Sequence, residues 1–452
     1  MDIIIAGAGK VGATLTGTLS AEGHDITLID SNKQVLDSII EKYDIMAVCG
    51  NCATMGVLRQ AGAEKADLLI VTTDADEINL LTCMTSHAIN AKMHTIARIR
   101  NPEYSGQIYQ MRSTFALSLV VNPEKMAAVE IERLLKYPGF LKRESFAKDR
   151  AEIVELRVED NSKLNGVSLS NLNSIIKCKV LVCTVLRNGT AIMPDGSFVL
   201  KTGDRVFVTA ATNVLTILLK NLGIITKRVN KVLLAGGSKT SVYLAERLLK
   251  SNIDVSVIEK DYDRCRELAE LLPGADIVCG DAGSFSFLES EGAAEFDAVV
   301  SLTGLDEMNI VISLYANDLK INQIITKMGH AENSNILDRL PIGSIVCPKE
   351  LCSNTIVRYV RAMQKQSGAA ISVHTIASGK AEAVEFLVDE KTLHIGEPLK
   401  KLKLKKNVLI VCISHSGTTE IPNGDSNYSV GDIVVVVTRA NTVLMQLNDI
   451  FE

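Results

Sequence analysis

The stretch from Ile3 to Asp30, IIIAGAGKVGATLTGTLSAEGHDITLID, decides the fold of this chain. An apolar run of strand length leads into a glycine loop, GAGKVG, at residues 7–12. A helical pattern follows the loop, and a second apolar run ends at Asp30. A strand, a helix and a strand in this order predict a parallel sheet whose strands are joined by crossover helices.

The glycine loop has the spacing of a nucleotide-binding turn. Gly7 permits the tight turn, Gly9 lets the backbone approach a pyrophosphate, and Gly12 lets the helix pack closely on the strand. The amino end of the helix favours negative charge, and Lys10 offers a point charge to a phosphate or else stays solvated. The residues that we predict to form this part of the site are Gly7, Ala8, Gly9, Lys10, Val11 and Gly12.

Polar residues also follow the ends of the other strands in this half. Asp30 can accept both ribose hydroxyl protons, which favours NAD over NADP because a 2′-phosphate would be repelled. The carboxyl ends of parallel strands share the edge at which open α/β sheets bind ligands. On that edge Asn51 is placed to contact adenosine and Arg98 to reach a terminal phosphate, and Thr72 and Thr73 end the fourth strand. For each of these four, a loop cap or a solvated surface position is the alternative.

The deciding stretch occurs twice. Residues 232–259 read VLLAGGSKTSVYLAERLLKSNIDVSVIE, at an offset of 229 from the first copy. The match continues in order and with small gaps, so that Gly203-Asp204 near the end of the first half recurs as Gly431-Asp432. Ordered similarity over the whole length indicates an internal duplication.

The second glycine loop is altered. Ser238 and Ser241 stand where the first loop has its second and third glycines, whereas Glu259 keeps the acid. Ser238 adds a side chain where a pyrophosphate must come close, and Ser241 is expected to crowd the helix against the strand. We therefore expect the first half to bind nucleotide well, and the second half either to bind a less demanding ligand or to be structural.

Each half divides into a larger and a smaller part. Residues 1–122 alternate strands with helices, and a helix is predicted over 123–138, ended by Pro138-Gly139. Residues 140–225 contain alternating strands and the hairpin signal Asn188-Gly189. The corresponding parts of the second half are residues 229–347, a helix at 348–366, and 368–452. The predicted fold class is α/β, with two doubly wound parallel-sheet domains that are each followed by a small α+β module.

Composition excludes several classes of protein. The 452 residues carry a formal charge of −5 and only 4% aromatic residues, with no Trp, which argues against nucleic-acid binding. No apolar run approaches the roughly 20 residues of a membrane span, and no signal peptide is recognised at the amino end. We therefore expect a soluble, intracellular, multidomain protein.

Rival motifs are weak. The pair Cys49 and Cys52 forms a CxxC, but no second CxxC is present to complete a zinc site, and the ten cysteines are expected to be reduced. The seven histidines are dispersed. The lysine-rich segment 400–406 is a solvated loop or a contact for an acidic partner or phospholipid headgroups. We expect neither a metal site nor a catalytic residue.

The tandem arrangement resembles the TrkA family, the cytosolic NAD-binding regulatory subunits of Trk-type potassium uptake systems. The resemblance covers essentially the whole chain. It rests on the glycine loop, Asp30, Gly50-Asn51-Cys52-Ala53, residues 67–74, Arg98 and Asn122-Pro123-Glu124. Each half then corresponds to a Rossmann-like RCK (or KTN) N-terminal domain and an RCK C-terminal module.

The resemblance also implies particular residues. It implies nucleotide contacts at Gly7, Gly9, Lys10, Val11, Asp30, Thr73 and Arg98. It places Glu124 near the terminal phosphates, brings Cys52 into the candidate site, and leaves Glu259 as the acid of a doubtful second site.

The function that the resemblance implies is that of a gating ring. Exchange of NAD⁺ and NADH, or of ATP and ADP, would change the shape of a ring of eight RCK units built from four chains. The ring would dock on an integral membrane Trk-type potassium transporter subunit, which places the chain in the cytoplasm at the inner face of the membrane.

Two other classes of function remain open. An NAD-dependent dehydrogenase with a duplicated Rossmann-like domain would need a general acid or base that faces the nicotinamide. The small modules offer no evident convergent set of Lys, His and Asp residues, so we favour a regulator over an enzyme. A sensor that binds a small effector at 166–204 or 396–432 is compatible with the regulatory function.

Overall fold

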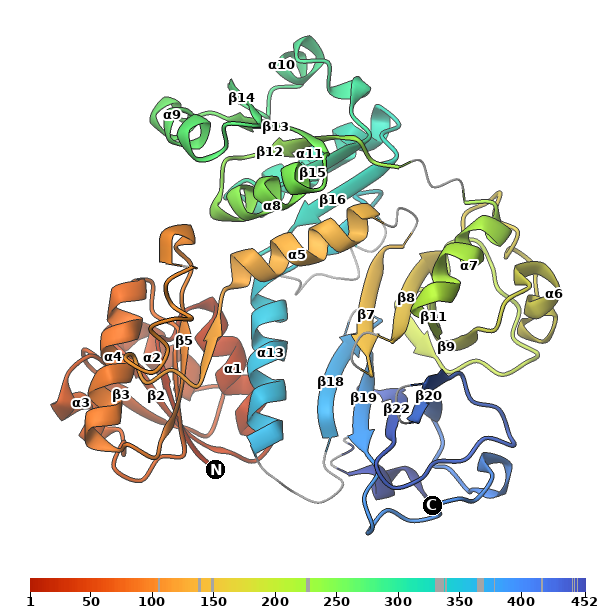
Figure 1. Cartoon of the computed structure of the whole chain (residues 1–452), viewed down its shortest axis with the longest axis horizontal. Helices are drawn as coiled ribbons and strands as arrows, with labels where there is room; N and C mark the ends of the chain where they lie inside the picture. Colours follow the sequence, from red (N-terminus) through yellow and green to blue (C-terminus); the bar gives the residue numbers. More distant parts are fainter. Residues whose placement is uncertain are drawn as a thin grey trace.

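The computed structural model describes residues 1–104, 106–136, 140–147, 150–224, 228–329, 337, 340–363, 370–377, 379–415, 418–440, 442, 444 and 446–452. Two large lobes and two small modules surround a pair of central helices (Figure 1). Across these described residues, no helix combines the length and the apolar character needed to cross a membrane.

The first lobe is a parallel six-stranded sheet in the order β3-β2-β1-β4-β5-β6. Its strands are β1 (Asp2–Ala6), β2 (Asp25–Asp30), β3 (Met46–Cys49), β4 (Leu68–Val71), β5 (His94–Arg98) and β6 (Leu119–Val121). Its helices are α1 (Lys10–Ala21), α2 (Lys33–Ile40), α3 (Met55–Gln60) and α4 (Asp76–Ile89). Alternate residues of β1 enter opposite cores, with Ile3 and Ile5 on one face and Ile4 and Ala6 on the other. Burial on both faces explains why β1 reads as a continuous apolar run.

The second lobe repeats this topology in the order β14-β13-β12-β15-β16-β17. Its strands are β12 (Lys231–Ala235), β13 (Asp254–Glu259), β14 (Asp276–Cys279), β15 (Ala298–Ser301), β16 (Gln323–Lys327) and β17 (Ser344–Val346). Its helices are α8 (Lys239–Lys250), α9 (Tyr262–Leu271), α10 (Phe285–Ser290) and α11 (Asp306–Asp318). The prediction of two doubly wound parallel sheets is confirmed.

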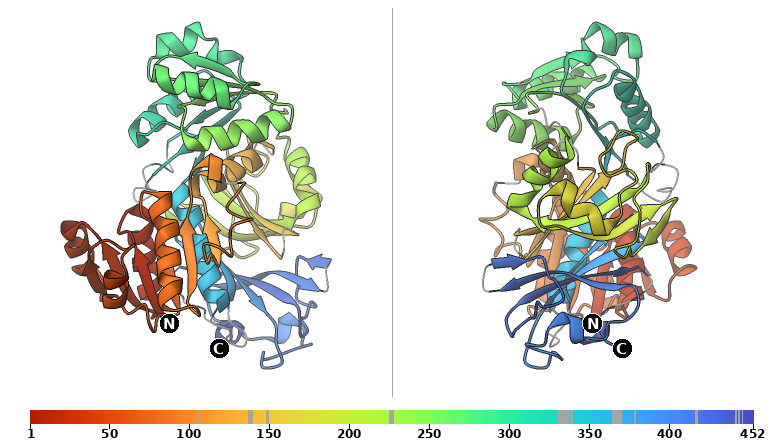
Figure 2. Two further views of the ribbon diagram at one scale, coloured as in Figure 1. Left: turned by 60° about the vertical axis from the view of Figure 1, so that its left-hand side comes forward. Right: turned by 90° about the vertical axis from the view of Figure 1, so that its right-hand side faces the viewer.

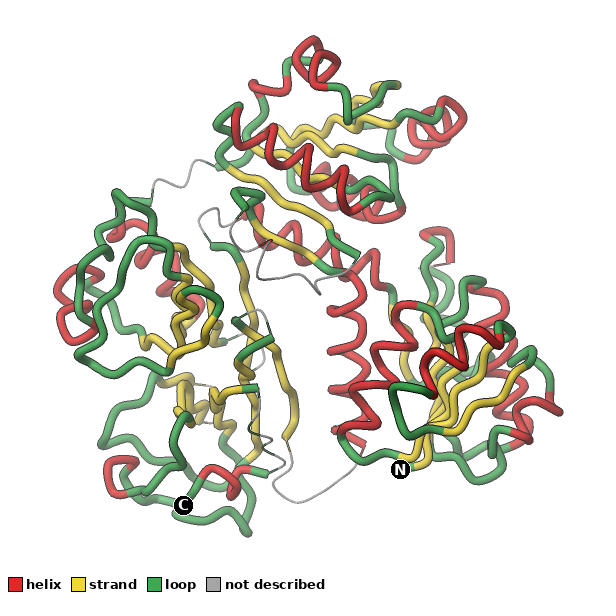
Figure 3. The backbone as a smooth tube through the Cα atoms, turned by 180° about the vertical axis from the view of Figure 1, so that it is seen from behind, coloured by secondary structure: helices red, strands yellow, loops and turns green. Residues whose placement is uncertain are grey.

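The two linking helices are exchanged between the lobes. Helix α5 (Pro123–Lys136) leaves the first lobe and packs Ala127 and Ile131 into the core of the second sheet. Helix α13 (Pro348–Met363) leaves the second lobe and packs Ile356 and Val360 against the first. The two helices also touch each other at the centre of the molecule (Figure 3). The expected ends of these helices, Pro138-Gly139 and residues 364–366, lie outside the described residues.

Charged pairs fix each exchanged helix to the opposite lobe. Arg247 of α8 pairs with Glu132 of α5 at 2.5 Å, and Arg361 of α13 pairs with Glu22 of the first lobe. Glu132 is only 5% exposed. Each pair therefore joins an exchanged helix to the lobe on which it packs.

Each small module is a five-stranded antiparallel sheet. The first, in the order β10-β9-β11-β8-β7, contains β7 (Lys142–Phe146), β8 (Ala151–Arg157), β9 (Leu181–Arg187), β10 (Thr190–Ile192), β11 (Arg205–Ala211), α6 (Leu172–Ile176) and α7 (Leu215–Leu222). The second, in the order β18-β19-β22-β20-β21, contains β18 (Ala370–Ile376), β19 (Ala381–Leu387), β20 (Val408–His415), β21 (Thr418–Glu420) and β22 (Ile433–Arg439). The hairpin turn between β9 and β10 has positive φ at both Asn188 and Gly189, which is the predicted type I′ geometry.

The two small modules share one core. Phe146 and Ile153 of the first module lie in the same buried cluster as Ala383 and Val435 of the second. The backbone amide of Ala147 donates to Oε1 of Glu385 at 2.9 Å. The modules lie side by side in all views (Figures 1 and 2). The two halves of the chain are therefore joined both at the linking helices and at the small modules.

Candidate functional site

The first glycine loop is shaped by two glycines and left open by a third. Gly7 has φ of +99°, and a Cβ there would lie 2.9 Å from the backbone of Thr72 and Thr73. A Cβ on Gly12 would lie 1.8 Å from the carbonyl oxygen of Gly7. Around a Cβ on Gly9, by contrast, there is no heavy atom within 4 Å among the described residues. The space above the amino end of α1 is thus open to a phosphate group.

Asp30 holds the loop from the neighbouring strand. Its Oδ2 accepts a hydrogen bond from the amide of Ala8 at 2.7 Å, and its Oδ1 accepts one from the amide of Asn32 at 2.8 Å. Half-buried at the end of β2, the carboxylate lies on the same sheet edge as the loop. The acid that was predicted to bind a ribose therefore also orients the loop.

A buried amide joins the ends of β4 and β5. Asn79 of α4 is 0% exposed, and its Oδ1 accepts hydrogen bonds from the amide of Thr73 at 3.0 Å and from its hydroxyl at 2.6 Å. Its Nδ2 donates to the carbonyl oxygen of Arg98 at 2.7 Å. Our prediction did not include Asn79, although it recurs as Asn309, which makes the same contacts with Thr303 and Lys327.

The far end of this edge is cationic and incompletely satisfied. Arg98, 8% exposed, donates to the carbonyl oxygen of Thr73 at 2.8 Å and to Asp74 at 3.0 Å. Arg100, which the prediction also missed, lies 3.9 Å from Glu124. Three buried atoms here have no hydrogen-bond partner among the described residues, namely Nε of Arg98, Nε of Arg100 and Oε2 of Glu124. Burying polar atoms without partners is costly, so this edge suits a polar ligand.

Glu124 lies between the two lobes. Burial raises the pKa of its carboxyl above the ordinary range. The positive charges of Arg100, Arg98 and Lys239 oppose this rise without cancelling it. Lys239 belongs to the second glycine loop, so the second lobe contributes a charge to the edge of the first.

The reciprocal contact involves Lys10. The Nζ of Lys10 lies 3.6 Å from the position that a Cβ on Gly329 would take, beside Asp306 of the second lobe. Burial lowers the pKa of Lys327, which ends β16, and the charge of Lys10 adds to this shift. The ligand edges of the two lobes therefore face each other, and the lysine of each loop reaches the opposite lobe.

The second glycine loop is held by hydrogen bonds between its own residues. The hydroxyl of Ser238 accepts a hydrogen bond from the amide of Ser241 at 3.3 Å, at the amino end of α8. The hydroxyl of Ser241 donates to the carbonyl oxygen of Gly236 at 2.5 Å. The expected close approach of Ser241 to the strand end is present, and its hydroxyl is used for a hydrogen bond there. Glu259 still accepts from the loop, at the amide of Gly237, at 2.7 Å.

The remaining predicted residues lie beside the site, and their side chains contact neighbouring protein groups. Asn51 is exposed, and its Oδ1 accepts from the amide of Ala53 at 3.0 Å, as a loop cap does. Thr72 is 3% exposed, and its hydroxyl donates to the carbonyl oxygen of Gly7 at 3.3 Å. Cys52 is buried and lies 3.5 Å from the hydroxyl of Thr82. Val11 is buried in the lobe core. In the described ranges, no group of three His, Cys, Asp or Glu side chains is arranged to hold a metal ion.

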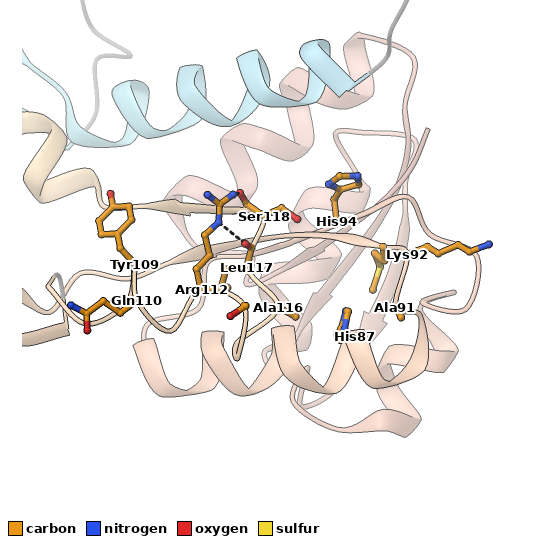
Figure 4. A pocket seen from close by; sticks show the side chains of 12 residues that line it. His87, Ala91, Lys92, His94, Tyr109, Gln110, Arg112, Ala116, Leu117 and Ser118 are labelled. Atoms are coloured by element: carbon orange, nitrogen blue, oxygen red, sulfur yellow. Dashed lines mark hydrogen bonds between the residues drawn. The ribbon is translucent and has the colours of Figure 1, made fainter.

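A separate pocket of about 580 Å³ lies away from this edge. It is lined by His87, Lys92, His94, Tyr109 and Arg112, among others (Figure 4). His94 begins β5, whereas the nucleotide edge lies at the opposite end of that strand. The pocket is therefore not part of the candidate site.

A duplicated parallel sheet with an open glycine loop, a loop-binding acid and a cationic edge defines a tandem Rossmann-like protein of the nucleotide-binding type. The TrkA-N domain family matches residues 3–123 and 232–348, and the TrkA-C domain family matches residues 153–223. The chain belongs to the TrkA family.

Its relatives are similar over nearly their whole length. The Trk system potassium uptake protein TrkA homolog of Archaeoglobus fulgidus is 31% identical, with 97% of each chain covered. The Trk system potassium uptake protein TrkA of Haemophilus influenzae is 30% identical, with 100% of this chain and 99% of the relative covered. These names agree with our expectation of a potassium-uptake component rather than an enzyme.

A solved structure shares the fold. The GsuK channel bound to NAD superposes with a TM-score of 0.60 at 15% identity, covering 97% of this chain and 76% of that chain. The similarity extends across both lobes and both small modules, which supports the RCK-type architecture for the chain as a whole.

Proposed function

We propose that the chain is a nucleotide-binding regulatory subunit that gates a Trk-type potassium transporter. The names of its relatives support the link to potassium uptake. The partner is an integral membrane transporter subunit, and the chain works at the cytoplasmic face of the membrane. Four chains in a ring of eight RCK units are the assembly that this function requires.

The first glycine loop is the proposed ligand site, and NAD⁺ or NADH is the proposed ligand, with ATP and ADP as the alternative pair. One observation carries the proposal: three orphaned buried polar atoms on Arg98, Arg100 and Glu124 lie on the edge that the open loop at Gly9 shares. When bound, the ligand would place the negative charge of its phosphates at this cationic edge. The loop amides and Lys10 would hold the pyrophosphate, and Asp30 would hold a ribose.

The same edge gives a physical route to gating. Arg98 and Arg100 are engaged by Asp74, Thr73 and Glu124. A ligand phosphate that reaches these guanidinium groups competes with those acceptors. Glu124 is the second residue of α5, whose other residues pack on the second lobe. ATP and ADP, which differ in their phosphates, would therefore favour different lobe orientations, as gating ligands must. NAD⁺ and NADH share the same pyrophosphate, so this route applies to the alternative pair, and the redox pair would have to be distinguished at the nicotinamide.

Calorimetric titration of NADH, NAD⁺, ATP and ADP tests the site. Asp30→Asn keeps one acceptor for the Ala8 amide, gives up the hydrogen bond from the Asn32 amide and removes the charge, so the strong ribose contact is lost. Glu259→Gln is the matched control in the second lobe. We expect Asp30→Asn to weaken binding at least tenfold, about 1.4 kcal/mol, and Glu259→Gln to leave the main binding event unchanged. Equal affinity in wild type and Asp30→Asn would move the site elsewhere.

The dehydrogenase alternative is tested separately. NADH is incubated with the full-length chain and candidate carbonyl substrates, and its absorbance is followed. We expect no turnover. Oxidation of NADH at a rate above the protein-free control would favour an enzyme.

A further inference from the structure

Two cysteines meet beside the acid of the second loop. Cys265 lies in the first turns of α9, and its thiol donates to the carbonyl oxygen of Glu259 at 3.2 Å. The amide of Gly280 donates to the same carbonyl oxygen at 2.9 Å. Cys279, the residue before Gly280, is the register partner of Glu259 on the neighbouring strand β14. Cys265 and Cys279 therefore lie on neighbouring elements on either side of the Glu259 carbonyl group.

The pair is a feature of the second lobe alone. In the first lobe Cys49 occupies the position of Cys279, but Leu36 occupies the position of Cys265. Leu36 is 2% exposed and belongs to the lobe core. A buried leucine therefore satisfies the fold at this position, and the second thiol is not needed for packing.

The two thiols differ in their access to solvent. Cys279 is exposed and Cys265 is buried. Burial, together with the neighbouring Cys279, raises the pKa of Cys265 to about 11. Because the thiolate is the reactive form, an external reagent meets Cys279 first.

We propose that Cys265 and Cys279 are a modification site that forms a reversible intrachain disulfide by exchange with a low-molecular-weight disulfide. The Cys279 thiolate attacks one sulfur of the reagent, forms a mixed disulfide and releases one thiol. The Cys265 thiolate then attacks the sulfur of Cys279 and releases the second thiol. Two protein thiols and one reagent disulfide become one protein disulfide and two reagent thiols, which carry away the two protons.

The disulfide would be coupled to the second glycine loop. The carboxylate of Glu259 accepts from the amide of Gly237 at 2.7 Å. Arg264, the residue before Cys265, donates to the carbonyl oxygen of Gly237 at 2.8 Å. A bond between Cys265 and β14 fixes the first turn of α9, from which Arg264 reaches the loop. Oxidation would therefore restrict residues 236–241. This inference does not depend on which nucleotide the first loop binds.

Peptide mapping tests the disulfide. The reduced full-length chain is exposed to oxidised glutathione, the remaining thiols are blocked with N-ethylmaleimide, and peptides are identified by mass spectrometry. We expect a peptide pair linked between Cys265 and Cys279 that dithiothreitol separates. Cys265→Ser should stop the reaction at a glutathione adduct on Cys279. Failure of wild-type Cys279 to react, or an adduct on Cys279 with Cys265 still open to alkylation, would overturn the proposal.

Hydrogen exchange tests the coupling. We expect amide exchange in residues 236–241 to slow after oxidation and to recover with dithiothreitol, while residues 7–12 stay unchanged. The Cys265→Ser variant should show no such slowing under the same treatment. Equal exchange of residues 236–241 in the oxidised and reduced wild type would overturn the link to the loop.

Discussion

Substituting Gly9 by alanine separates ligand binding from folding at the first loop. Gly9 has φ of −67° and ψ of −173°, an extended conformation that alanine adopts readily. The added methyl group meets no described atom within 4 Å. The free chain should therefore keep its stability or gain about 0.4–1 kcal/mol from a less flexible unfolded state.

The same methyl group occupies the space proposed for the pyrophosphate. An overpacked contact costs about 1–3 kcal/mol, which corresponds to roughly 5–150-fold weaker binding. The assay pairs thermal unfolding of the free chain with calorimetric titration of NADH. We expect an unchanged or higher melting temperature together with weaker binding.

Two further variants sharpen this test. Gly56→Ala adds a methyl group to α3 that also meets open space, so it should preserve NADH affinity. Ser238→Gly removes the side chain that caps α8 and should add a weak second binding event. Unaltered NADH affinity in Gly9→Ala would refute the assignment of the pyrophosphate to this loop, and a lower melting temperature would refute the reasoning about open space.

Three other predictions concern the first glycine loop, the ion pair between the lobes and the buried carboxyl group of Glu124. Gly12→Ala should destabilise the chain by about 1–3 kcal/mol, which thermal melts can show. Gly12→Ser, which copies the second loop, should lower the stability less. Both variants should lose NADH binding in calorimetric titrations. Glu132→Gln should lower the free energy of unfolding by about 1.5–3 kcal/mol, and a double-mutant cycle with Arg247→Met in urea should show non-additivity. Because burial raises the pKa of Glu124, its ionisation in the folded state costs free energy, and stability should fall as pH rises from about 4.3 through the raised folded pKa. Glu124→Gln should lack this fall when unfolding is measured across that range, and identical pH profiles would contradict it.

Local patterns predicted the parts of this fold that depend on neighbouring residues. The turn at Gly7 and the hairpin at Asn188-Gly189 need positive φ, and that need is visible in the residue types. Helix α1 begins at Lys10, inside the glycine loop and not after it, because Gly9 serves as its N-cap. Such boundaries depend on cap geometry more than on periodicity.

The family resemblance implied that the units pair through the two linking helices, but which sheet each helix covers could not be read from the sequence alone. The apolar face of α5, with Ala127 and Ile131, would suit either sheet, since the two sheets are copies of one another. The positive charge that Lys239 brings near Glu124 follows from the exchange and was missed for the same reason. The spacing around Ser241 showed the lost glycine but not the hydrogen bond that its hydroxyl makes with Gly236.

The exchange of the linking helices also means that the first lobe is synthesised well before the helix that completes its core. Leu15 of the first lobe shares its core with Ile356 of α13, about 340 residues later in the chain. At about 5–20 residues per second on the ribosome, the first sheet waits roughly 17–70 s for its final cover. During that interval an apolar face is open to chaperones or to the α13 helix of another nascent chain. A duplicated gene that encodes both halves in one polypeptide keeps the matching helix tethered to its sheet, whereas the first half alone would leave this apolar face uncovered.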